Sequence, residues 1–233
     1  MQNNKNIKLS DNLFEIIELN PYVLFVFEHL QLLDKPKNLT VKSFCKAHSL
    51  DESLFLALLN VYNGNDNHIE LKPQKKYLKT IVPFLKHSHQ YYKNEKYPFI
   101  ANLMKILQLK VNSKEIALLK NFFEAYKNEV IEHLEYEEKN VFPYIERLLI
   151  KKTIPQNDIE FSIKDYQEHH NDIEEKLSDL KNLLIHHLKV GDFASLKRQI
   201  ILNLYELQYD LHAHSIIEDK ILIPIILTIE ANE

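Results

Sequence analysis

Residues 133–143 read HLEYEEKNVFP, and residues 214–224 read HSIIEDKILIP. Both stretches follow one pattern: His, three residues, Glu, an acidic residue, Lys, any residue, two apolar residues and Pro. Residues four apart lie on one face of an α-helix, so each copy directs an imidazole and a carboxylate to the same point. One such pair alone is typical of an exposed helix contact, whereas two copies with matching flanks, 81 residues apart, indicate a shared site.

The composition predicts what surrounds this site. A chain of 233 residues, with 45% hydrophobic and 27% charged residues, is long enough for one large or two modest domains with a sizeable core. Gly64 and Gly191 are its only glycines. A β-protein uses glycine in its hairpin turns, whereas long helices need almost none. We therefore expect an all-α fold.

Charge and cysteine content exclude several classes of partner and compartment. The net charge of −4 is spread over interspersed acidic and basic residues, so neither nucleic acid nor membrane lipid is an expected partner. Cys45 is the only cysteine, which excludes an internal disulfide and fits a reducing compartment. Residues 1–10 lack the apolar core of a signal peptide, and no apolar run reaches the roughly 18 residues of a membrane span. The expected location is the cytoplasm.

A polar, turn-forming cluster at residues 63–67 predicts a boundary between two domains. Residues 1–66 are expected to form a small helical N-terminal domain, with helices near 13–29, 41–47 (capped by Thr40) and 51–59 (beginning at Asp51). Residues 67–233 are expected to form an antiparallel four-helix bundle from long amphipathic helices near 75–93, 113–149, 161–189 and 193–229, with a short helix at 99–107. Pro143 and Pro224 are expected to end or bend their helices.

The heptad register selects which histidines face the middle of this bundle. In the fourth helix, the inward positions alternate in steps of three and four and run Leu204, Leu207, Leu211, His214 and Glu218. The same reading favours His170 over His169 in the third helix, and His89 over His87 in the first. The predicted metal ligands are His89, His133, Glu137, His170, His214 and Glu218.

These ligands predict the chemistry of the metal. Burying so many ionisable groups without compensation would cost several kcal/mol per charge, and bound metal ions would remove that cost. Nitrogen and oxygen ligands without thiolate suit iron or manganese and disfavour a structural zinc site. Two ions that share both glutamates keep positions for a bridging oxo or hydroxo group or a diatomic molecule. Ferritin-like di-iron sites use Glu-x-x-His instead, and no glutamate here has a histidine three residues later.

Together with Ser88-His89 and His170-Asn171-Asp172, the two motifs resemble the hemerythrin-like (HHE cation-binding) di-iron proteins over residues 74–229. The set of four histidines and two glutamates resembles the iron–sulfur cluster repair (RIC) branch, and so does the helical N-terminal module. That branch carries an adjacent cysteine pair in its N-terminal domain, which residues 30–38 lack here. The resemblance implies two non-haem iron ions, in preference to manganese or zinc, bridged by carboxylates and an oxo or hydroxo group.

Three classes of function follow from these observations. The first is a nitrosative or oxidative stress protein that protects or repairs iron–sulfur clusters, with nitric oxide, oxygen or hydrogen peroxide as ligand and iron–sulfur proteins as partners. The second is a sensor of oxygen, nitric oxide or redox state, and the third is iron storage. Whether the protein is an enzyme, and its oligomeric state, stay open. Cys45 is expected to pack in the core, and Tyr126 and Tyr209 to be donors near the metals.

Overall fold

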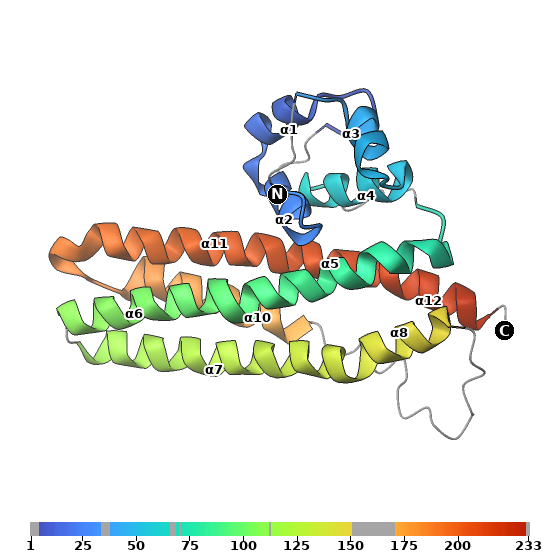
Figure 1. The fold of residues 1–233 in the computed structure, drawn as a ribbon. Helices are drawn as coiled ribbons and strands as arrows, with labels where there is room; N and C mark the ends of the chain where they lie inside the picture. The colour runs from blue at the N-terminus through green and yellow to red at the C-terminus, as the bar shows by residue number, and fades with distance from the viewer. Residues whose placement is uncertain are drawn as a thin grey trace, which may run out of the picture. The chain divides into compact units, whose positions relative to one another are not determined.

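The computed structural model of the protein describes residues 5–33, 38–65, 69, 71–111, 113–150 and 171–231. Within these ranges every regular element is a helix (Figure 1), apart from one isolated antiparallel bridge between Asn12 and Thr40. The all-α prediction is confirmed. None of the helices in the described ranges is long and apolar enough to cross a membrane.

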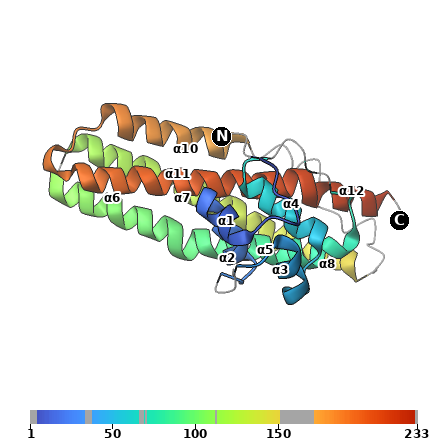
Figure 2. The same ribbon diagram turned by 90° about the horizontal axis from the view of Figure 1, so that it is seen from above.

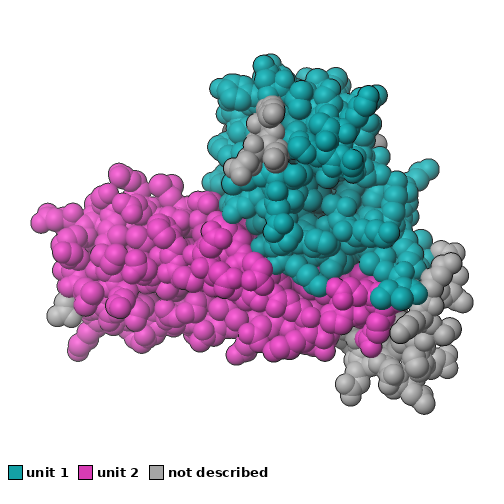
Figure 3. Space-filling model, viewed as in Figure 1, with its two compact units in different colours: residues 1–88, 148–151, 212–233 teal, residues 89–147, 152–211 magenta. Residues whose placement is uncertain are grey.

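The chain forms two compact units, coloured separately in Figure 3. Residues 1–88, 148–151 and 212–233 make unit 1, and residues 89–147 and 152–211 make unit 2. The helices α5 (Leu78–Tyr91), α8 (Phe142–Leu149) and α11 (Ala194–Ile217) each contribute residues to both units. The domain boundary predicted at residues 66 and 67 lies outside the described residues and stays a prediction.

Four short helices follow one another at the start of unit 1: α1 (Leu13–Leu19), α2 (Leu24–His29), α3 (Val41–His48) and α4 (Glu52–Tyr62). The Thr40 side chain accepts a hydrogen bond from the Ser43 amide, and Asp51 accepts from the amides of Ser53 and Leu54, so both predicted caps are confirmed. Their core is aromatic. Three fully buried rings pack at centroid distances of 5.4–5.8 Å: Phe27, Phe44 and Phe55.

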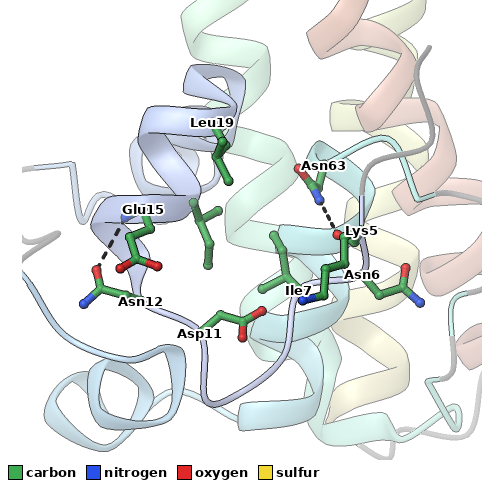
Figure 4. A pocket seen from close by; sticks show the side chains of 9 residues that line it. Lys5, Asn6, Ile7, Asp11, Asn12, Glu15, Leu19 and Asn63 are labelled. Carbon is green, nitrogen blue, oxygen red and sulfur yellow. Dashed lines mark hydrogen bonds between the residues drawn. The ribbon is translucent and has the colours of Figure 1, made fainter.

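Asparagine side chains fasten the start of the chain to α4. The Asn60 side chain accepts from the Ile7 amide at 2.8 Å and donates to the Ile7 carbonyl at 3.2 Å. Asn63 donates to the Lys5 carbonyl at 3.0 Å, beside a cavity of about 330 Å³ (Figure 4). None of the predicted ligands lines this cavity.

Cys45 is buried on α3, as the sequence predicts for a packing residue. Burial raises the pKa of its thiol from the ordinary value of 9.0 to about 12, and the nearby Glu52 and Asp51 carboxylates add to the shift. The thiolate is the nucleophile, so this shift lowers its population near neutral pH roughly a thousandfold.

We therefore expect iodoacetamide to modify Cys45 very slowly in the native protein. The measurement is the alkylation rate at pH 8, followed by mass spectrometry. The same protein in guanidinium chloride is the control, because unfolding exposes the thiol and restores its ordinary pKa. Equal rates in the two samples would contradict a purely packed cysteine.

Unit 2 contains the core of a four-helix bundle. Its helices are α6 (Tyr97–Val111), α7 (Lys114–Tyr136), α10 (Asn171–Asn182) and the first part of α11, which lie side by side with successive helices antiparallel (Figures 1 and 2). Each helix contributes buried side chains to one core cluster. Its members include Leu103, Leu107, Leu119, Phe123, Leu177, Leu180, Leu204 and Leu207. The predicted bundle is confirmed.

Three turns of π-helix carry the chain past prolines. They are Tyr92–Lys96, Glu137–Val141 and Glu218–Leu222, and each begins six residues before Pro98, Pro143 or Pro224. In each turn, the amide before the proline donates to the carbonyl five residues back instead of four. Proline lacks an N–H and its ring clashes with the carbonyl four residues back, and the wider π turn relieves both problems.

The sequence predicted that Pro143 and Pro224 end or bend their helices, and the first of these alternatives is wrong. Pro143 does not end its helix, because α8 follows the π turn directly, and α12 (Ile223–Glu230) continues past Pro224 in the same way. The short helix predicted at residues 99–107 is not separate either. Helix α5, the π turn Tyr92–Lys96 and α6 form one continuous helical segment through Pro98.

Candidate metal centre

Glu137 lies between two imidazoles. It is the first residue of the π turn after α7, and its side chain is fully buried. Its Oε2 atom lies 3.1 Å from His89 Nε2, and its Oε1 atom lies 3.0 Å from His133 Nε2. His89 is in the last turn of α5 and His133 is one helical turn before Glu137 on α7. One carboxylate thus contacts imidazoles from two helices.

The second motif repeats this arrangement on α11. His214 and Glu218 are four residues apart, both are buried, and His214 Nε2 lies 3.1 Å from Glu218 Oε1. Glu218 also begins a π turn, so both glutamates occupy the same position relative to their prolines. The structure therefore gives the two sequence motifs the same local geometry.

The two motifs contribute to a single cluster. His89, Glu137, His214 and Glu218 each offer one ligand atom, and these four atoms lie within 4.8 Å of one another. His133 contacts Glu137 as described above. His170, the remaining predicted ligand, and His169 lie outside the described residues. The structure thus brings together four of the six predicted ligands, with a fifth in contact with one of them.

The spacing of these atoms fits a metal ion. Metal–nitrogen and metal–oxygen bonds in proteins are about 2.0–2.2 Å long, so two neighbouring ligands at a right angle on one ion lie about 3.0 Å apart. The three imidazole–carboxylate separations are 3.0–3.1 Å. The ligand atoms of the cluster are nitrogen and oxygen only, since Cys45 does not belong to it. Such a buried set is able to hold a metal.

Two further residues contact the Nδ1 atoms of the imidazoles, on the side of each ring away from the cluster. Neither was predicted from the sequence to be part of the site. Ser88 Oγ lies 2.9 Å from His214 Nδ1, and His89 Nδ1 lies 3.2 Å from Glu138 Oε1. Glu138 is partly buried, with its side chain 27% exposed. The hydrogen bond from His89, together with Lys93, lowers the pKa of Glu138 to about 2 although partial burial opposes the shift. Their position next to ligands in the sequence is the signal that could have identified them.

Other histidines fall where the register predicted. His87 is half-buried and donates from Nδ1 to the His29 carbonyl at 2.8 Å, so it points away from the cluster that its neighbour His89 joins. His186 and His187 are exposed. His29 is a buried histidine that the register analysis did not find; it stacks on Phe25 at a centroid distance of 5.7 Å.

Tyr126 is buried in the bundle core, where the hydroxyl of Tyr97 donates to its hydroxyl at 3.4 Å. Burial raises the pKa of Tyr97 well above its ordinary value of 10.0. The Tyr97 phenol is therefore neutral. The predicted role of Tyr126 and Tyr209 as donors near the metals stays a prediction.

Comparison with known families matches a large part of the chain to one domain family. Residues 80–226 match the family described as "Hemerythrin HHE cation binding domain". The matched range covers more than half of the chain and contains all six predicted ligands. No curated protein and no solved structure matches the sequence at a significant level.

Proposed function

We propose, because the chain belongs to the hemerythrin HHE cation-binding domain family, that it is a non-haem di-iron protein acting in the nitrosative and oxidative stress response. The observation that carries the proposal is the Glu137 carboxylate, whose two oxygens face imidazoles of two helices at 3.0 and 3.1 Å. The proposed iron ligands are His89, His133, Glu137, His170, His214 and Glu218.

Iron suits this set because histidine and carboxylate ligands without thiolate favour iron or manganese. Bound iron would supply redox chemistry and coordination positions open to nitric oxide, oxygen or peroxide. The protein's own residues supply the surroundings: His89, His214, Glu137 and Glu218 are at most 4% exposed, so the walls of the site exclude bulk water. Small ligands fit such a site better than large substrates do.

The proposed physiological role is protection of iron–sulfur clusters, and it rests on the resemblance to the cluster repair branch. Residues 30–38 lack the cysteine pair of that branch, and Cys45 is a buried thiol with a raised pKa. We therefore assign the protective chemistry to the metal centre rather than to thiols. Iron–sulfur proteins are the proposed partners.

A sensor is the second candidate function, and one contact favours it. His87 on α5 binds the His29 carbonyl at the end of α2, while its neighbours Ser88 and His89 contact His214 and Glu137. Three consecutive residues thus connect the metal cluster to the N-terminal helices within a single helix. A change at the centre that moved α5 would change the His87 contact.

The test compares His89→Ala with His87→Ala, two substitutions two residues apart on α5. We expect His89→Ala to lose most bound iron and His87→Ala to keep two irons per chain, since His89 contacts Glu137 whereas His87 contacts the His29 carbonyl. Iron content and the near-ultraviolet absorption of coupled ferric ions are the measurements. Equal iron loss in the two variants would contradict the ligand assignment.

The same pair separates the two functions. If the protein protects clusters, an iron–sulfur enzyme exposed to nitric oxide should lose protection with His89→Ala and keep it with His87→Ala. If the protein is a sensor, the wild type should give no protection in this assay. Metal-free wild-type protein, purified after expression with ample iron, would contradict both candidates.

A further inference from the structure

Ser88 determines which nitrogen of His214 faces the cluster. Ser88 is fully buried, and its hydroxyl donates to the Leu85 carbonyl at 2.7 Å. A hydroxyl has one proton, so the oxygen can only accept at its second contact, which is His214 Nδ1 at 2.9 Å. The neutral His214 ring must then carry its proton on Nδ1. Its Nε2 lone pair is left facing Glu218, 3.1 Å away.

Glu138 does the same for His89, with a different chemical group. An ionised carboxylate only accepts, so His89 donates from Nδ1 to Glu138 Oε1 at 3.2 Å. Lys93 holds that carboxylate through both oxygens, at 2.6 and 2.7 Å. The Nε2 atom of His89 is left facing Glu137 at 3.1 Å. Each imidazole is therefore oriented by a group that is not itself in the cluster.

These two orienting groups differ in charge. A carboxylate that accepts a hydrogen bond from Nδ1 makes the imidazole more basic and a stronger metal ligand. A neutral hydroxyl in the same place fixes the orientation of the ring but adds little electron density to it. We propose that Ser88 and Glu138 are positioning residues that present His214 and His89 to metal through Nε2, and that Glu138 makes His89 the stronger donor. This inference rests on the proposed di-iron site. Iron bound to His89 would then have a lower reduction potential than it would have without the Glu138 carboxylate.

The first experiment removes the charge behind His89. Glu138→Gln keeps the size of the side chain, and Glu135→Gln is the matched control on the same helical segment. The Glu135 side chain is 46% exposed and pairs with Lys139 at 2.8 Å without touching an imidazole. We expect Glu138→Gln to weaken iron binding about 10-fold or more and to raise the reduction potential of one iron. Glu135→Gln should change neither quantity. The measurements are chelator competition and a spectroscopic redox titration.

The second experiment tests the hydroxyl behind His214. Ser88→Ala removes the acceptor, and we expect a loss of iron affinity of about 10-fold, without the change in reduction potential that Glu138→Gln produces. Ser88→Thr keeps the hydroxyl and should restore binding. Rescue by threonine distinguishes orientation of His214 from simple packing, because threonine changes the packing volume but keeps the hydrogen bond.

The outcomes separate this inference from the di-iron proposal. If wild-type protein binds two irons but Glu138→Gln and Glu135→Gln have the same affinity and potential, the inference is wrong and the di-iron site stands. If Ser88→Ala fails to fold, the Glu138 and Glu135 comparison decides alone. If the wild type binds no iron, cobalt(II) or manganese, the proposed site fails and the inference fails with it.

Discussion

Stripping the metal from the loaded protein is expected to lower its melting temperature by about 8–16 °C. A ligand present at a thousand times its Kd stabilises the folded state by about 4 kcal/mol, and each kcal/mol shifts the melting temperature of a chain of this size by about 2–4 °C. Without metal, the carboxylates of Glu137 and Glu218 stay buried beside the imidazoles of the cluster. Burial of such groups costs free energy that the metal would offset.

The difference in stability between loaded and metal-free protein is expected to decrease as the pH falls. Imidazole and carboxylate bind metal only in their deprotonated forms, so protons compete with the metal and displace it as the pH falls. The extra stability of the loaded protein is therefore present at neutral and higher pH and is lost on acidification. Scanning calorimetry of loaded and chelator-treated samples at several pH values measures both effects. Identical melting of the two samples at pH 7.5 would contradict a metal-stabilised core.

Replacing Glu137 with glutamine is expected to have the largest effect of any single change at the centre. Its two oxygens contact imidazoles of two helices, so the amide would lose the negative charge and place an NH2 group against a ring nitrogen. Loss of an outer hydrogen-bonding partner typically costs about 10- to 100-fold in metal affinity. Loss of a shared carboxylate ligand should cost more than that, so the purified variant should hold less than one iron per chain.

Glu132→Gln is the matched control for this substitution. Glu132 is exposed, lies five residues earlier on the same helical segment, and takes no part in the cluster. Iron content by elemental analysis and affinity by chelator competition are measured on both variants, with circular dichroism as a check on folding. A Glu137→Gln protein that keeps two irons at wild-type affinity would remove Glu137 from the ligand set.

Much of the bundle was predictable because its buried stripe is regular. The register placed Leu204, Leu207 and Leu211 inward, and all three are buried; it also separated His89, which is fully buried, from His87, which is not. A regular stripe of buried leucines fixes the register of its helix. The register then predicts which other residues of that helix face inward, histidines included. The two glutamates were identified in the same way, from the repeated spacing to their histidines.

The features that the sequence did not predict depend on contacts between segments distant in sequence. Glu138 sits in a charged run that is typical of a solvated surface, and its partners His89 and Lys93 lie 49 and 45 residues earlier. Ser88 acts on His214, 126 residues later. The continuity of the helix through Pro98 escaped prediction for a different reason. A proline normally stops a helix, and the π turn that accommodates it has no characteristic amino-acid composition by which it could be predicted.

The π turns also mean that spacing along the chain, as well as residue type, carries structural information. One extra residue in a turn rotates everything beyond it by about 100° around the helix axis relative to an α-helix. Beyond Glu137 and Glu218, the rotational phase of α8 and α12 therefore depends on the six-residue interval to each proline. Tyr144 and Ile145 on α8, and Ile225 and Ile226 on α12, are buried in the phase that this interval sets. An insertion or deletion of one residue there would leave the sequences of α8 and α12 unchanged and still rotate these apolar faces away from the positions in which they are buried.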